Sequence, residues 1–127
     1  MTDSEPTRVL RRMIAAFATG DTRDCGDYLS PSYLDHQGRA GVPLRGLDGF
    51  RKVVASAHRS TTPQLSIEDV IADEARAVAR VRWRFAAPGQ EERTERETIE
   101  IVRVEDGKAV EHWGAEAWSR KLPPATP

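Results

Sequence analysis

The stretch ARAVARVRWRF, residues 75–85, decides the fold of this chain, because its apolar and basic residues alternate. The apolar positions are Ala77, Ala79, Val81, Trp83 and Phe85, and the basic positions are Arg76, Arg80, Arg82 and Arg84. An alternation of period two places the two kinds of side chain on opposite faces of a β-strand. The stretch therefore predicts a strand with one face on an apolar core and a cationic face on the other side.

The neighbouring segments predict three further strands. Residues 64–73 precede the first strand, and residues 92–104 and 108–118 follow it. The stretches APGQ at 87–90 and EDGK at 105–108 separate these segments, and short polar turns that contain glycine are typical of hairpins. We therefore expect a meander of four antiparallel strands in the second half of the chain.

The first half of the chain predicts three helices. Residues 5–19 carry apolar residues at helical spacing and end at Gly20, and residues 46–59 repeat the pattern. A short helix through residues 22–29 is expected to end before Pro31, because the residue ahead of a proline avoids helical geometry. Helices followed by strands indicate an α+β fold, in which the helices pack against one face of a curved sheet.

The remaining segments complete the predicted organisation. Residues 32–38 are expected to be extended, and residues 38–46 form a glycine-rich loop. A chain of 127 residues is long enough for one domain with a sizeable core, and too short for two of ordinary size. We expect a single domain over residues 1–120 and a disordered, proline-rich tail over residues 121–127.

Composition and charge argue against several classes of protein. The chain is 39% hydrophobic and 31% charged, and its 19 basic and 20 acidic residues give a net charge of −1. This balance predicts no nucleic-acid partner. The sequence shows neither a signal peptide nor a membrane span, so we expect a soluble, cytoplasmic protein. The single Cys25 lacks a disulfide partner or metal-ligand spacing, and it is expected to be a small buried apolar residue.

Four stretches in this order carry a resemblance to a known family. They are FATGDTRDCGDYLSPSYLDHQG (17–38), GLDGFRKVV (46–54), VARVRWRF (78–85) and IVRVEDGKAVEHWG (101–114). Over residues 8–118 the chain resembles SnoaL-like polyketide cyclases, which belong to the nuclear transport factor 2-like and ketosteroid isomerase-like superfamily. The resemblance implies a cone-shaped α+β barrel, in which a strongly curved, mostly antiparallel sheet wraps the helices around an apolar pocket.

The resemblance also implies a type of chemistry and an assembly. Enzymes of this kind act as acid-base catalysts without a metal or an organic cofactor, as aldol cyclases, isomerases, dehydratases or epoxide-opening enzymes. They often form homodimers through the outer face of the sheet. The implied ligand is an apolar small molecule.

Two departures from the family bear on this expectation. Cyclases of the family carry a catalytic aspartate four residues after the tryptophan of the His-Trp motif, where this chain has Ala117. Glu116 stands beside it, but one step along a strand reverses the side to which a side chain points, unless a bulge re-aims it. The hairpin at 86–93 is also shorter than in many relatives, which predicts a pocket more open to water.

Three residues are our candidates for proton transfer: His36, Glu100 and Glu116. The resemblance places His36 at the pocket wall, where it either fixes the loop through hydrogen bonds or orients and protonates a substrate. Asp35 is expected to point away from His36 in an extended backbone. Glu100 either lies between apolar pocket walls or faces outward, where it would pair with an arginine of the neighbouring strand.

The last strand poses a question of faces. His112 and Trp113 alternate, so only one of them faces the pocket. With Trp113 inside, His112 would share the opposite face with Glu116 and Trp118, where it could contribute to a dimer interface.

Two hypotheses of function follow. In the first, the chain is a cofactor-free enzyme that performs acid-base chemistry on a polyketide-like small molecule. Its substrate-binding residues would be Trp83, Trp113, Phe50, Phe85, Tyr33 and Asp35. In the second, the chain is a non-catalytic binding or dimerisation domain that has lost the usual aspartate. A cavity with only apolar walls would favour the second hypothesis.

Overall fold

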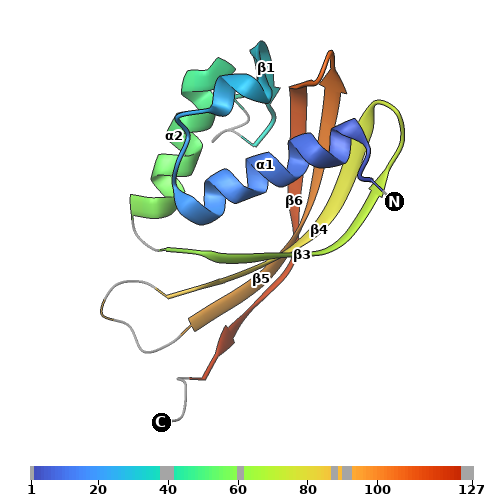
Figure 1. The fold of residues 1–127 in the computed structure, drawn as a ribbon. Helices are drawn as coiled ribbons and strands as arrows, with labels where there is room; N and C mark the ends of the chain where they lie inside the picture. Colours follow the sequence, from blue (N-terminus) through green and yellow to red (C-terminus); the bar gives the residue numbers. More distant parts are fainter. Residues whose placement is uncertain (1, 38–41, 60–61, 87–88, 90–92, 124–127) are drawn as a thin grey trace.

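Two helices lie on one side of a bent sheet in the computed structural model (Figure 1). The structure describes residues 2–37, 42–59, 62–86, 89 and 93–123. The helical elements are α1 (Glu5–Thr19), the 3-10 turn η1 (Cys25–Asp27) and α2 (Gly46–Arg59). The strands are β1 (Leu29–Asp35), β2 (Leu44–Arg45), β3 (Gln64–Ala72), β4 (Arg76–Phe85), β5 (Arg93–Glu105) and β6 (Lys108–Leu122).

The sheet contains the predicted meander and two more strands. Its order is β2-β1-β6-β5-β4-β3. Each of the strands β3, β4 and β5 pairs antiparallel with the strand that follows it in the chain, as expected. The segment expected to be merely extended is strand β1, which pairs parallel with β6 so that Asp35 lies beside His112. Within the described residues the sheet is open, with β2 and β3 at its edges. The predicted cone-shaped barrel is therefore corrected to an open, six-stranded mixed sheet.

The number of helices is also corrected. The short helix expected over residues 22–29 is only the three-residue turn η1. Gly26 lies in its middle, and glycine disfavours a helix by about 1 kcal/mol relative to alanine. Leu29, which is fully buried, already belongs to β1. Because burial of Leu29 places the end of the segment in strand β1, too few residues remain for a helix.

Helix α1 has the boundaries that the sequence predicts. The Ser4 side chain accepts a hydrogen bond from the Thr7 N–H, and Pro6 occupies the first turn. Such a side-chain cap satisfies one of the free N–H groups at a helix start. Gly20 ends the helix with φ 78°, and its N–H donates to the Ala16 carbonyl. A left-handed residue of this kind favours glycine.

The core lies between the helices and the inner face of the sheet. Helix α1 contributes Leu10 and Met13, α2 contributes Phe50 and Val54, and β4 contributes Val81, all of them buried. The apolar face predicted for β4 is thus confirmed as the inner face. Cys25 is a free, buried cysteine, as predicted.

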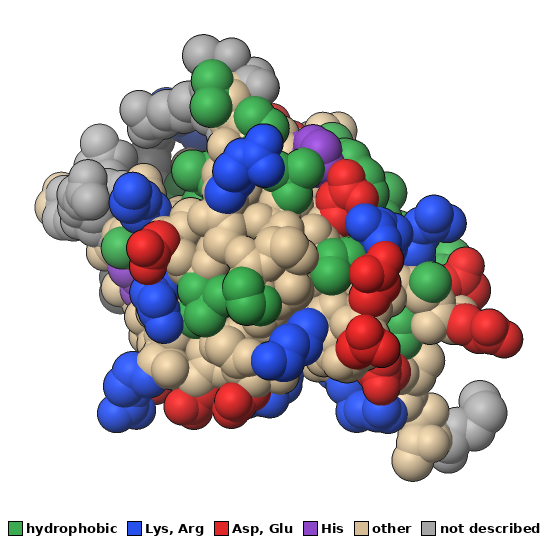
Figure 2. Space-filling model, turned by 90° about the horizontal axis from the view of Figure 1, so that it is seen from above, with side chains coloured by type: hydrophobic (Ala, Val, Ile, Leu, Met, Phe, Trp, Pro, Cys, Tyr) green, Lys and Arg blue, Asp and Glu red, His purple; other side chains and the backbone are tan. Residues whose placement is uncertain are grey.

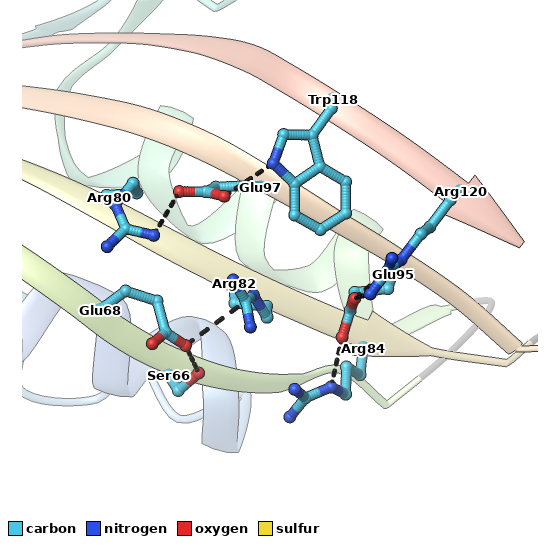
Figure 3. A network of polar contacts seen from close by, with 9 residues as sticks. All are labelled: Ser66, Glu68, Arg80, Arg82, Arg84, Glu95, Glu97, Trp118 and Arg120. Atoms are coloured by element: carbon cyan, nitrogen blue, oxygen red, sulfur yellow. Dashed lines mark hydrogen bonds and ion pairs between the residues drawn. The ribbon is translucent and has the colours of Figure 1, made fainter. Parts of the chain in front are cut away.

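The outer face of the sheet is a network of ion pairs (Figure 3). Arg80 contacts Glu97 at 2.8 Å and Arg84 contacts Glu95 at 2.6 Å. Trp118 donates an indole hydrogen bond to Glu97 at 2.7 Å. The row of arginines predicted from the alternation is therefore confirmed on the outer face, and acidic residues of β5 balance it. The homodimer expected through this face stays a prediction.

Charges are mixed on the helix side as well. Figure 2 shows basic and acidic side chains interspersed over this face. In the part of the chain that the structure describes, no helix combines the length and the hydropathy that crossing a bilayer requires. Strand β6 continues to Leu122, two residues into the predicted tail, and residues 124–127 lie outside the described residues.

Two aliphatic residues test this division of the sheet into buried and exposed positions. Leu29 is fully buried, whereas Ile71 is 72% exposed. We expect Leu29→Ala to lower the free energy of unfolding by about 2–5 kcal/mol, because it removes buried methyl groups and leaves a cavity. Ile71→Ala should change it by less than about 1 kcal/mol. Urea unfolding of both variants measures the difference, and equal losses would contradict the described packing.

Candidate active site

A cavity of about 650 Å³ opens between helix α2 and the inner face of the sheet. Helices contribute Phe17, Lys52, Val53, Ser56 and Ala57 to its wall, and the segment before α2 contributes Val42, Pro43 and Leu44. The sheet side contributes Gln37, Trp83, Arg96, Thr98, Glu100 and Glu116. The cavity therefore combines apolar walls with a small number of polar and charged groups, which is typical of small-molecule sites.

A buried histidine between two carboxylates lies beside this cavity. His112 is only 5% exposed, and its Nδ1 lies 3.1 Å from Oδ1 of Asp35. Its Nε2 lies 3.1 Å from Oε1 of Glu100. Parallel pairing of β1 with β6 brings Asp35 next to His112. Glu100 is two residues from Val102, the antiparallel partner of His112, so the two side chains are diagonal neighbours on the inner face.

Further hydrogen bonds hold Asp35 in place. The Tyr33 hydroxyl donates to its Oδ2 at 3.5 Å, and the Gln37 N–H donates to its Oδ1 at 2.9 Å. Burial opposes ionisation of Asp35, but the hydrogen bond and charge of His112, together with the hydrogen bonds from Gln37 and Tyr33, outweigh it and hold the pKa of Asp35 below its usual value. Asp35 is therefore an ionised partner of His112 rather than a free proton donor.

His112 is protonated at neutral pH. Burial alone would lower its pKa, but the hydrogen bonds to Asp35 and Glu100, together with their charges, raise the pKa to about 9. An imidazolium ring donates from both nitrogens, which fits one carboxylate on each side. A buried cation of this kind needs both partners, because an unpaired charge in the interior is costly.

Glu100 connects this buried group with the cavity. One oxygen, Oε1, accepts from His112, and the carboxylate also lines the cavity. The other oxygen, Oε2, is buried and has no hydrogen-bond partner among the described residues. Of the two arrangements that the sequence left open for Glu100, the outward ion pair is wrong and the inward position is observed. A buried carboxylate oxygen without a partner is rare in proteins, and a catalytic role is one explanation for it.

Glu116 also lines the cavity, near its exposed rim. It lies four residues after His112 on regular strand, so both side chains point to the inner face. The bulge comes one residue later: Thr98 pairs with Glu116 and Glu97 pairs with Trp118, so that Ala117 is the extra residue. The predicted common face of His112 and Glu116 is observed, but it is the inner face, and the bulge sends Trp118 to the outer face.

His36 and Trp113 lie on the outer side of the sheet. Their rings stack with centroids 5.0 Å apart and an interplanar angle of 9°, and Nε2 of His36 lies 2.7 Å from Oε2 of Glu111. Neither residue is among the described residues that line the cavity. The alternation of faces was predicted correctly, but its direction was wrong: the buried pairing of Asp35 with His112 turns His36 and Trp113 outward.

The other predicted wall residues divide into three groups. Trp83 lines the cavity, and its indole N–H donates to Oγ1 of Thr98 at 2.9 Å. Phe50 and Tyr33 are buried in the core, with their rings 6.2 Å apart. Phe85 is half-buried beneath the guanidinium of Arg96. Tyr33 and Asp35 therefore support His112 instead of lining the described wall.

Sequence reasoning missed the pairing of Asp35 with His112 and the position of Arg96 in the cavity. The alternation along the His-Trp motif allowed either His112 or Trp113 to face inward. The large apolar ring of Trp113 favoured an inward tryptophan, which is wrong. No group of three or more His, Cys, Asp or Glu side chains in the described ranges is arranged to hold a metal ion. That the chain needs no metal or organic cofactor stays a prediction.

The protonated His112 should make stability depend on pH. Its folded pKa of about 9 lies above its ordinary value of 6.5, so its contribution is complete below pH 6.5 and is lost as the pH rises through 9. Over this interval we expect the free energy of unfolding to fall by on the order of 3 kcal/mol.

Urea unfolding between pH 6 and pH 10 measures this dependence. His112→Gln should remove that part of the slope, whereas His36→Gln, which changes the outward-facing histidine, should keep it. An unchanged slope in His112→Gln would contradict the buried imidazolium.

Known proteins share both sequence and fold with this chain. Residues 10–112 match the family model of the SnoaL-like domain. Aklanonic acid methyl ester cyclase AcmA from Streptomyces galilaeus is 32% identical over 71 residues, which are 56% of this chain and 49% of AcmA. The chain thus spans about half the length of this curated relative.

Solved structures share the fold. IdmH from Streptomyces antibioticus superimposes with a TM-score of 0.77 at 21% identity, over 88% of this chain and 91% of IdmH. An epoxide hydrolase of the LEH-like type from M. tuberculosis does so with a TM-score of 0.71 at 13% identity, over 88% and 82% of the two chains. At these identities the likeness concerns the fold alone. Because the family model covers most of its length, the chain belongs to the SnoaL-like domain family.

Proposed function

We propose that this chain is a polyketide cyclase-type enzyme that performs acid-base chemistry without a cofactor, with Glu100 as the proton acceptor. The observation that carries the proposal is that Glu100 lines a largely apolar cavity while its Oε2 has no hydrogen-bond partner in the described part of the chain. The similarity to AcmA supports the reaction class. The substrate would be an apolar, oxygenated molecule small enough for about 650 Å³.

An aldol cyclisation gives each group a role. Oε2 of Glu100 takes a proton from a carbon next to a carbonyl group, and the resulting enolate carbon attacks a second carbonyl of the same molecule. A carbon–carbon bond forms, and Glu100 returns the proton to the new alkoxide. His112 donates to Oε1 throughout, so that it holds the carboxylate in one orientation while Oε2 works. Asp35 keeps His112 charged and positioned.

The wall of the cavity favours this enzyme over a binding domain that has lost its catalytic group. A cavity with only apolar walls would have favoured the second hypothesis, but Glu100, Glu116 and Arg96 all line the cavity. Position 117, where relatives of the cyclase type carry aspartate, is the bulge residue here. In the proposed enzyme Glu100, on the neighbouring strand, takes the role of that carboxylate, and Glu116 is a secondary group at the rim.

Epoxide opening by a water held between carboxylates and an arginine is less well supported. Arg96 lies on the same face of β5 as Glu100, but four residues away, which separates their Cα atoms by about 13 Å. The described residues contain no ion pair between Arg96 and a carboxylate. A water bound by Glu100 would therefore lack the arginine that such a mechanism requires.

Proton exchange of a simple ketone tests the proton acceptor. With 2-tetralone in D₂O, we expect the wild-type protein to accelerate replacement of the protons next to the carbonyl, as followed by ¹H NMR. Glu100→Gln should lower the rate by about 10²–10⁴-fold, the usual contribution of a general base. Glu116→Gln, the matched control at the rim, should lower it by less than about tenfold.

Two outcomes would contradict the proposal. No acceleration by the wild-type protein would favour the non-catalytic binding domain. Equal effects of both substitutions in folded variants would show that Glu100 has no special role. Conversion of aklanonic acid methyl ester, followed by liquid chromatography and mass spectrometry, then shows whether the chain shares the substrate of AcmA.

A further inference from the structure

An arginine lies in the cavity with its guanidinium on two aromatic rings. Arg96 of β5 pairs with Trp83 of β4 on the inner face of the sheet. Its guanidinium carbon is 5.0 Å from the centroid of the Trp83 ring and 5.3 Å from that of the Phe85 ring. These contacts hold the cation in place without neutralising its charge.

Arg96 differs from Arg80, Arg82 and Arg84 on the outer face of β4. Each of those three has a carboxylate within 4.0 Å, although the Nε of Arg82, like that of Arg96, has no hydrogen-bond partner among the described residues. Arg96 has no ion pair with any described residue, and its Nε is buried without a hydrogen-bond partner among them. A buried donor without a partner is costly, and the side chain of Arg96 also lines the cavity. The missing partner of the guanidinium is therefore best supplied by a ligand.

The chemistry of the guanidinium indicates which ligand group this is. It lies over two aromatic rings, and the edge of a guanidinium carries N–H donors that match the two oxygens of a carboxylate. A neutral ester could accept a hydrogen bond from Arg96 but would leave the charge unbalanced. We propose that Arg96 binds a carboxylate group of the substrate, so that the enzyme acts on an apolar carboxylic acid rather than on its ester. This inference rests on the proposed function, since it takes the cavity as the substrate site.

The positions of Arg96 and Glu100 also indicate how long the substrate must be to reach both residues. Their Cα atoms are about 13 Å apart along β5. The carboxylate would lie at the Trp83 end and the reacting carbon at the Glu100 end. A molecule of two or three fused rings with an acid group at one end meets this requirement, and AcmA, whose name specifies a methyl ester, would differ in this respect.

A pair of probes that differ only in charge tests the inference. Anthraquinone-2-carboxylic acid and its methyl ester share the same rings, and quenching of tryptophan fluorescence reports their binding. At pH 7 we expect the wild-type protein to bind the acid at least tenfold more tightly than the ester. Arg96→Met, which keeps the apolar stem and removes the charge, should abolish the preference while changing ester affinity less than threefold.

Lys52→Met is the matched control, because Lys52 is the other cation in the described wall. It should retain the preference for the acid. Equal affinity of the wild-type protein for acid and ester, failure of both probes to bind, or loss of the preference in Lys52→Met alone would each overturn the inference.

The two proposals can fail separately. If Arg96→Met removes the preference but Glu100→Gln leaves ketone exchange unchanged, the carboxylate site stands and the proposed function fails. If ketone exchange depends on Glu100 but the acid and the ester bind equally, the proposed function stands and the carboxylate site fails.

Discussion

A charged imidazole ring enclosed between two carboxylates is the constraint on which the rest of this site depends. His112 is almost fully buried, so its charge is tolerated only because Asp35 and Glu100 each lie 3.1 Å from a ring nitrogen. These partners come from β1 and β5, on either side of β6. The three-residue contact therefore links three strands, and it fixes the parallel register in which Asp35 lies beside His112.

The same contact determines which side chains reach the cavity. Because Asp35 and His112 point inward, the next residues, His36 and Trp113, point outward and stack there. Oε1 of Glu100 accepts from the imidazolium, Oε2 has no hydrogen-bond partner among the described residues, and the residue lines the cavity. The cavity thus contains the carboxylate of Glu100, which is oriented by its hydrogen bond with His112. It also contains the guanidinium of Arg96, which is positioned by its contact with the Trp83 ring.

Much of the fold could be predicted from local patterns. The alternation in 75–85 gives β4 and its two faces, and the spacing of apolar residues with Gly20 gives the bounds of α1. The failures came where long-range burial outweighs local preference. The segment around Gly26 has a helical pattern, but Leu29 is drawn into β1. The parallel pairing of β1 with β6 joins residues 77 positions apart, and no local pattern specifies such a register.

At the site, the alternation correctly predicted that His112 and Trp113 point to opposite faces of the sheet. It could not predict which of the two faces inward. Tryptophan is the more apolar residue, which made Trp113 the natural inner residue. The choice is reversed because His112 finds a carboxylate on each side, and a paired charge can be buried. Arg96 was not predicted to line the cavity, because the arginines of this sheet were expected on the outer face. Its inward position follows from the parity of β5, in which Arg96, Thr98 and Glu100 share one face.

The protonation state of His112 in the intact, folded protein tests this account most directly. Nitrogen chemical shifts of its ring, followed by NMR from pH 5 to pH 10, report whether both nitrogens carry a proton and at which pH one is lost. The account predicts an imidazolium at neutral pH that titrates with a pKa of about 9. A neutral ring at pH 7, with a pKa at or below the ordinary 6.5, would contradict it.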